Sequence, residues 1–268
     1  MTSPTLARLA APVAAVSRLG GPAPIEMRPM SSRPGTTQRL CAATLAAVLA
    51  ACSAPPPGSG YFPLEPGHRW TYDVKSEFEN HIVTHETLTL ATLGRETIAG
   101  GDAWRRHSDS GVDYWLRSDD SGIYRVASKS DLDAESKPDA ARRYVLKTPL
   151  QTGTAWQATT TAYLLQRRQE FPREIRHTHP AVPMHYHIEA VGEAVDTRAG
   201  RFERCLRIKG HASVRLFADP VVGWRDMPLV TTEWYCEGVG LVRLVREEPA
   251  GSTFLSGGTI TLELVQWQ

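Results

Sequence analysis

Four histidines within one short segment have the spacing that points most directly to chemistry in this 268-residue chain. They are His177, His179, His185 and His187. Residues two apart on a strand share a face, and Pro180 and Pro183 predict a turn that would set the two pairs opposite each other. Imidazoles so arranged could bind zinc or copper, or could sense pH by joint protonation. An exposed polar hairpin tip explains the same residues without any chemistry.

The first 51 residues predict a leader rather than part of the fold. An apolar run over residues 40–51 follows Arg33 and Arg39. This run is shorter than the roughly 20 residues that span a bilayer, and its length is typical of the apolar region of a signal peptide. Met27 and Met30 are in-frame alternatives to the first Met as the start.

The leader ends at Leu49-Ala50-Ala51-Cys52, which resembles the bacterial lipobox. In that motif the chain is cut before the cysteine, and the thiol carries the lipid. We therefore expect fatty acyl chains, palmitate among them, to anchor Cys52 in a membrane. An ordinary signal peptide with an incidental cysteine is the alternative. Ser53, rather than Asp, favours the outer membrane with the domain facing the periplasm, and residues 52–60 predict a flexible tether.

Cys205 and Cys236 remain after the leader is removed, because Cys41 lies within it. Each lies in a strand-like run, over residues 202–209 and 231–236. The envelope is an oxidising compartment in which such a pair can form a disulfide. A bridge closing this loop would contribute about 3 kcal/mol in the chain-entropy treatment. Two buried free thiols are the alternative.

A duplicated pattern organises the rest of the chain. Pro-Leu-x-x-Gly-x-x-Trp occurs over residues 63–70 and again over 149–156. Three shorter matches follow in the same order in both copies: 96–100 with 196–200, 113–115 with 233–235, and 122–126 with 240–244. Such internal similarity predicts two related modules, which we place at about 61–128 and 148–247. The charged stretch 129–147 is the expected linker, with at most a short helix.

Alternating apolar and polar residues over 87–93 and 259–265 indicate strands. No segment shows a long helical stripe between caps. The Trp residues at repeat positions favour core packing. We therefore predict an all-β domain over residues 61–268, in which the two modules share one curved antiparallel sheet.

Two motifs, one near each end of this domain, resemble those of a known group. Phe62-Pro63-Leu64 with Gly67, Trp70 and Tyr72 forms the opening signature, and Trp234-Tyr235 with Gly238-Val239-Gly240 forms the closing one. Together they resemble uncharacterised bacterial envelope lipoproteins. The resemblance implies a curved antiparallel sheet and an envelope location, and it implies no reaction.

Composition and motifs narrow the function classes. The net charge of +1 argues against a nucleic-acid partner. The sequence contains no nucleophile elbow, zinc-protease helix, phosphate-binding loop or dinucleotide fingerprint. We therefore expect a non-enzymatic binding or assembly module without a cofactor. It would hold an apolar small molecule in the concave face of the sheet or an envelope protein at its edge. A metal-binding protein using the four histidines, and an enzyme with an unrecognised site, are the alternatives.

Overall fold

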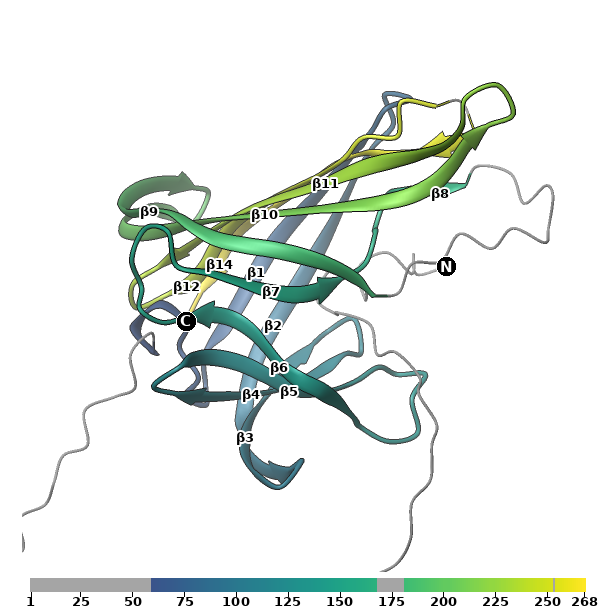
Figure 1. The fold of residues 1–268 in the computed structure, drawn as a ribbon. Helices are drawn as coiled ribbons and strands as arrows, with labels where there is room; N and C mark the ends of the chain where they lie inside the picture. Colours follow the sequence, from purple (N-terminus) through teal and green to yellow (C-terminus); the bar gives the residue numbers. More distant parts are fainter. Residues whose placement is uncertain (1–58, 168–180, 253) are drawn as a thin grey trace, which may run out of the picture. The chain divides into compact units, whose positions relative to one another are not determined.

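The computed structural model describes residues 59–167, 181–252 and 254–268 (Figure 1). The predicted all-β class is confirmed, because the one helical element of these residues is a single turn, η1 (Ser59–Tyr61). Among the residues described, no helix combines the length and apolarity needed to cross a membrane. The strands are β1 (Arg69–Phe78), β2 (Val83–Ile98), β3 (Gly101–Ser108), β4 (Asp113–Asp119), β5 (Gly122–Lys129), β6 (Lys137–Lys147), β7 (Ala155–Thr160), β8 (Gln166–Arg167), β9 (Val182–Thr197), β10 (Gly200–Asp219), β11 (Gly223–Cys236), β12 (Gly240–Glu248), β13 (Leu255–Ser256) and β14 (Gly258–Trp267).

Twelve of these strands form one antiparallel sheet in the order β6-β5-β4-β3-β2-β1-β14-β12-β11-β10-β9-β7. The first six strands of the chain make one half of the sheet, and β7, β9, β10, β11, β12 and β14 make the other. Within each half, neighbours in the chain are neighbours in the sheet. The short strands β8 and β13 pair only with each other. The predicted pair of related modules sharing one sheet is therefore confirmed.

Matching residues play matching parts in the two halves. Gly67 and Gly153, the glycines of the duplicated motif, have φ angles of 96° and 90°, a conformation that costs glycine little. Each glycine turns the chain into the first strand of its half, and the Trp three residues later is buried in that strand. The repeat in the sequence is thus a repeat of backbone conformation.

The linker expected at 129–147 is shorter than predicted, because its second part forms β6. This strand pairs with β5 and completes the first half. Its charged residues are accommodated in two ways: Asp139 forms an ion pair with Arg125 of β5, and Arg142 lies exposed on the surface. Leu146 of the same strand is fully buried. Charge alone therefore misidentified a strand with one polar face as a loop.

The two halves meet at two junctions. At the first, β1 and β14 form a backbone ladder from Trp70 opposite Trp267 to Phe78 opposite Gly258. At the second, β6 and β7 lie next to each other without forming a ladder. The sheet therefore curves round until it almost closes on itself (Figure 1). We call the second junction the seam.

Alternation along strands such as β1 separates the inside of this curved sheet from the outside. In β1, Trp70, Tyr72, Val74 and Ser76 are buried at every second position. Residues 61–264 contain all the hydrophobic clusters found in the described part of the chain. The sheet and its core thus belong to one continuous part of the chain, from η1 to β14.

Candidate ligand-binding cavity

The inside of the sheet is not filled completely. A cavity of about 220 Å³ lies between the two halves, with walls from β1, β4, β6, β7, β11, β12 and their neighbours. Its apolar walls come mainly from Phe62, Leu88, Leu90, Leu116, Leu241, Leu244 and Leu262. Its polar groups come from tyrosines, arginines and one glutamate. Mostly apolar walls with a few converging polar groups are typical of small-molecule sites.

A buried carboxylate holds the chain beside this cavity. Glu248 of β12, which is fully buried, accepts hydrogen bonds from the backbone N–H groups of Tyr163, Leu164 and Leu165 at 2.8, 2.8 and 3.1 Å. Arg246 donates to its other oxygen at 2.9 Å and to the carbonyl of Thr161 at 3.1 Å. The chain after β7 is thus drawn across the inside of the sheet and fixed there.

One wall of the cavity is a pair of stacked rings. Trp156 of β7 and Tyr186 of β9 lie with centroids 5.7 Å apart and planes 10° apart. Tyr186 can lie flat because Gly210 faces it on β10. A Cβ at Gly210 would come within 2.8 Å of the Tyr186 ring and 2.6 Å of the Thr231 methyl carbon. The Trp156 Nε1 is buried and donates to no protein acceptor.

Two further tyrosines place their hydroxyl groups in the cavity, and only one of these hydroxyls has a hydrogen-bond partner. The Tyr235 hydroxyl donates to Glu233 at 2.8 Å, whereas the Tyr114 hydroxyl is buried without a partner. Burial raises the pKa of both phenols well above the ordinary value, so both stay neutral donors. Burial also raises the pKa of the Glu233 carboxyl. The cavity wall therefore contains hydrogen-bond donors that have no acceptor, together with a carboxyl group whose ionised form is disfavoured by burial.

Four guanidinium groups reach the cavity wall, from Arg106, Arg125, Arg143 and Arg246. Arg106 lies between the rings of Phe62 and Trp70, with its guanidinium carbon 4.2 and 4.4 Å from their centroids. It donates to the carbonyl of Pro63 at 2.6 Å. Burial lowers its pKa to about 10, which leaves it cationic at neutral pH. Most of the cavity wall is thus apolar, and its charged side chains are mainly positive.

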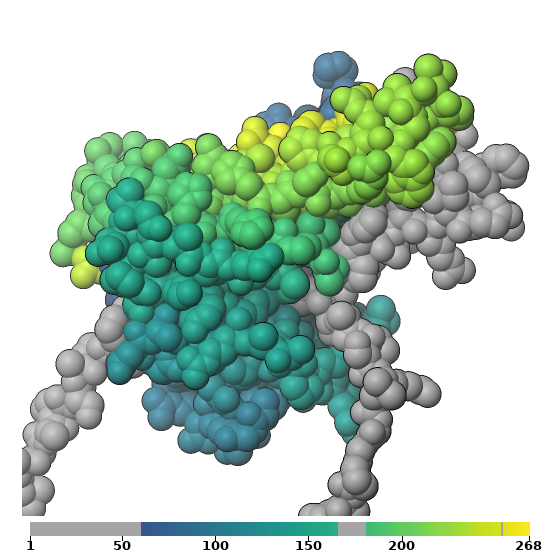
Figure 2. Space-filling model, viewed as in Figure 1, coloured from purple at the N-terminus to yellow at the C-terminus, as the bar shows by residue number. Residues whose placement is uncertain are grey.

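Side chains, rather than a backbone ladder, cover the seam beside this cavity. Arg143, Tyr144 and Val145 of β6 and Trp156, Ala158 and Thr160 of β7 are all part of the cavity wall. Across the seam, Arg143 donates to the Thr159 hydroxyl at 3.2 Å. In Figure 2 the teal surface of β6 and β7 is continuous on the face shown.

Two of the four histidines of the predicted hairpin, His185 and His187, lie in β9. His177 and His179 lie outside the described residues, but both edges of β9 are occupied at His185 and His187. On one side His187 faces Ala155 of β7, and on the other it faces Lys209 of β10. No strand can therefore pair with β9 there to bring a second histidine pair alongside. Instead, His187 stacks on His211 of β10, with ring centroids 6.0 Å apart.

No group of three or more His, Cys, Asp or Glu side chains in the described ranges is arranged to hold a metal ion. His185 lies opposite His211 in the β9–β10 register, and its side chain is exposed. These imidazoles project from the sheet outside the cavity. Metal binding by His177, His179, His185 and His187 remains a prediction.

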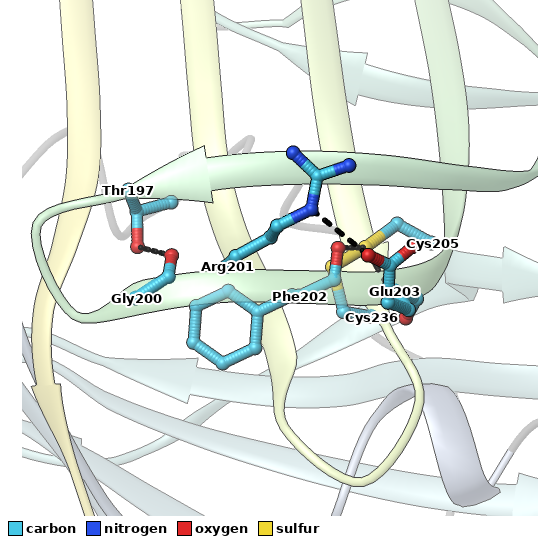
Figure 3. Close-up of a disulfide and its surroundings, with 7 residues drawn as sticks. All are labelled: Thr197, Gly200, Arg201, Phe202, Glu203, Cys205 and Cys236. Carbon is cyan, nitrogen blue, oxygen red and sulfur yellow. Dashed lines mark hydrogen bonds and ion pairs between the residues drawn. A yellow bond between two sulfur atoms is a disulfide. The ribbon is translucent and has the colours of Figure 1, made fainter.

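Cys205 and Cys236 form a disulfide between directly opposed residues of β10 and β11, with Cα atoms 4.0 Å apart (Figure 3). The bridge lies at the base of the β9–β10 turn, whose tip folds over β14. There Arg198 N–H donates to the Glu263 carboxylate at 2.8 Å and Ala199 N–H to the Leu264 carbonyl at 3.1 Å. The disulfide thus fixes the start of a folded-over hairpin, and neither cysteine lines the cavity. The lipobox residue Cys52 lies outside the described residues.

The sequence did not identify the cavity residues. Arg125 and Tyr114 occupy apolar runs, Tyr124-Arg125-Val126 and Tyr114-Trp115-Leu116, and a polar group at an inward strand position is a usable signal. Arg143 gave no such signal, because it belongs to the charged stretch interpreted as a linker. Trp156 was expected to pack in the core, and it is buried there with its ring facing the cavity.

No protein-family profile and no curated protein matches the chain. Among solved structures, it is similar to a candidate lipoprotein from Parabacteroides distasonis, with 15% identity and a TM-score of 0.41 over 78% of this chain and 98% of that chain. It is also similar to a candidate exported protein with a YmcC-like fold from Bacteroides fragilis. There the identity is 13% and the TM-score 0.33, over 80% of this chain and 98% of that chain.

Proposed function

We propose that this chain is a lipid-anchored bacterial envelope protein whose β domain binds a small amphiphilic molecule in its interior, without catalysing a reaction. The single observation that carries the binding function is the cavity of about 220 Å³ with apolar walls and unpartnered polar groups. At ~30 Å³ per water, the cavity has room for about seven water-sized groups, so the ligand is small. Its body would lie against the leucine side chains.

The anchor is supported by the leader and the lipobox-like Leu49-Ala50-Ala51-Cys52. The opening and closing signatures, which resemble those of envelope lipoproteins, agree with the same address. Ser53 after the cysteine favours the outer membrane, with the domain in the periplasm. Acyl chains on Cys52 would hold the domain at the membrane. Residues 53–60 would form a flexible tether between the anchor and the domain.

Metabolic labelling tests the anchor directly. The full chain is expressed with an alkyne analogue of palmitate, and the label and the membrane fraction are followed. We expect label and membrane association in the wild-type chain and loss of both in Cys52→Ser, while Cys41→Ser retains both. Unlabelled wild-type protein, or Cys52→Ser protein that stays labelled in membranes, would overturn the anchor.

Native mass spectrometry tests the cavity. Residues 53–268, which contain the whole sheet and its core, are exported with a cleavable signal and purified from the envelope. We expect an added mass corresponding to a small amphiphile. Ala158→Phe fills the cavity wall and should remove the added mass. Gln157→Phe, on the exposed face of the same strand, is the matched control and should retain it.

Three results would count against this proposal. A bare polypeptide mass would favour docking of an envelope protein instead. A mass of zinc or copper, lost in His185→Ala with His187→Ala, would favour the metal-binding alternative. Turnover of a substrate that is abolished in Glu233→Gln would identify an enzyme, because Glu233 is the carboxylate in the cavity wall.

A further inference from the structure

The charges around the cavity are unequal. Four guanidiniums and one carboxylate, Glu233, line it. Asp139 binds Arg125, whose Nε donates to the carboxylate at 2.6 Å, and Glu248 binds Arg246 at 2.9 Å. Even with these two carboxylates and an ionised Glu233, the four guanidiniums keep one excess positive charge. In the part of the chain that the structure describes, no carboxylate is in ion-pair distance of Arg106 or Arg143.

Arg106 is partly satisfied, because its Nη2 donates to the Pro63 carbonyl although its Nε is buried without a partner. Two aromatic faces and the Pro63 carbonyl surround its guanidinium. Arg143 differs, because its one protein hydrogen bond is to the Thr159 hydroxyl across the seam. It also lies directly opposite Arg125 in the β5–β6 register. Burial first, and the Arg125 charge second, lower its pKa to about 10. An anion beside Arg143 would relieve both the desolvation and the repulsion.

Tyr114 supplies a second donor to the same part of the cavity. Its side chain is 6% exposed and its hydroxyl has no partner. The Arg125 guanidinium lies 6.0 Å from its ring centroid, and the charges of both Arg125 and Arg143 act on its phenol. A buried donor left without an acceptor is costly. An anion bound at Arg143 could accept this hydrogen bond.

The remaining wall of the cavity is mainly apolar. Leu88, Leu116 and Leu262 line it, and none of them carries a group that a polar ligand could use. A molecule with a charged end at the seam and a short hydrocarbon chain would match both parts. The cavity volume of about 220 Å³ is below the roughly 300–1,000 Å³ of sites for drug-sized ligands, which favours a short hydrocarbon chain.

We infer that the ligand is a short-chain carboxylate, with its carboxylate at the Arg143 guanidinium and the Tyr114 hydroxyl and its chain against the leucines. This inference rests on the proposed function, since it names the chemical class that the same cavity takes. A planar carboxylate can accept two parallel N–H bonds from one guanidinium. The site is therefore selective for a monoanion of this shape.

Calorimetric titration of residues 53–268 with hexanoate, hexanol and hexylamine tests the inference, because the three share a chain and differ in headgroup. We expect hexanoate to bind about tenfold or more tightly than hexanol, since hydrogen bonds to charged groups are the stronger ones. Hexylamine should not bind. Arg143→Gln should weaken hexanoate by about tenfold to a hundredfold and leave hexanol unchanged. The adjacent Arg142→Gln, on the exposed face, should change neither.

Tyr114→Phe keeps the test valid if Arg143→Gln folds poorly. Its hydroxyl has no partner in the protein, so its removal should leave the melting temperature unchanged or higher, yet weaken hexanoate about threefold to tenfold. Equal binding of hexanoate, hexanol and hexylamine, unaffected by both variants, would overturn the carboxylate inference and leave cavity binding intact. Failure of all three probes to bind would overturn the proposed function itself.

Discussion

The two junctions between the six-stranded halves differ, although the halves repeat each other. At the first, β1 and β14 are paired over the whole length of β1. At the second, β6 and β7 are adjacent but unpaired. The duplicated motif leads into β1 at one junction and into β7 at the other. β1 continues for 10 residues, whereas β7 ends after 6.

Glu248 fixes the chain where β7 ends. Its carboxylate binds three consecutive backbone N–H groups just beyond β7, so the chain there turns inward instead of continuing beside β6. Buried N–H groups need acceptors, and here a side chain replaces a neighbouring strand. The two halves therefore repeat the number and order of strands, while the contacts of one buried residue distinguish the end of β7 from the end of β1.

Removal of the Glu248 carboxylate should have the largest effect on stability, and it tests the difference between the two junctions. Glu248→Ala leaves Arg246 buried without its ion-pair partner and leaves the three N–H groups without an acceptor. We expect a loss of about 3–5 kcal/mol in the free energy of unfolding, measured by urea denaturation. Glu247→Ala, at the exposed neighbouring position, should change it by less than about 0.5 kcal/mol. Equal stability of the two variants would contradict the role given to Glu248.

Loss of the disulfide should lower the stability of the second half. The first half contains no cysteine and so has no equivalent bridge. Cys205 and Cys236 are separated by 31 residues in the sequence, so their bond restricts the unfolded chain considerably. We expect the double variant Cys205→Ala with Cys236→Ala to lose about 3 kcal/mol, again by urea denaturation. Hexanoate affinity should be preserved, because neither cysteine lines the cavity. A loss of ligand binding with normal folding would show instead that the two are coupled.

A matched pair of substitutions compares the junctions themselves. Val74 is buried in β1 at the paired junction, whereas Val145 is partly buried in β6 at the seam. Val74→Ala should cost about 2 kcal/mol through lost burial and packing, and Val145→Ala less than about 1 kcal/mol. Thermal unfolding of both variants gives the comparison. Similar costs would mean that the seam is packed as tightly as the paired junction.

Titration of the Glu233 carboxyl should have the smallest effect on stability. This residue lies in β11 of the second half and lines the cavity. Burial raises its pKa above the ordinary value of 4.5 in the folded protein, so the folded state holds this proton more tightly than the unfolded chain. Its stabilising contribution is therefore complete below about pH 4.5 and is lost as the pH rises through the folded pKa.

Glu233→Gln removes this titration. Relative to the wild type, the variant should gain stability between about pH 4 and pH 7, by about 1.4 kcal/mol for each unit by which the pKa is raised. Urea denaturation at both pH values measures the difference. A relative loss of stability with rising pH would show that ionised Glu233 is favoured in the folded state.

The sequence predicted the repeated elements well because they have local causes. Gly67 and Gly153 mark turns that need a positive φ, and alternation marks the strands that follow. It failed over residues 137–147, because a strand with one exposed charged face resembles a polar loop. It did not predict that β9 pairs with both β7 and β10 at His185 and His187, since that pairing is set by contacts between distant residues. Cys205 and Cys236 were identifiable as candidates, but only the β10–β11 register places them opposite each other.

The most direct test of the account is a methyl NMR titration of leucine-labelled protein, residues 53–268, with hexanoate. Saturable shifts are expected at Leu88, Leu116 and Leu262, which line the cavity. The methyl signals of Leu216 and Leu229, which belong to a separate hydrophobic cluster, should not move. Shifts confined to Leu132, which is 92% exposed, or no saturable shift at all, would contradict a ligand site inside the sheet.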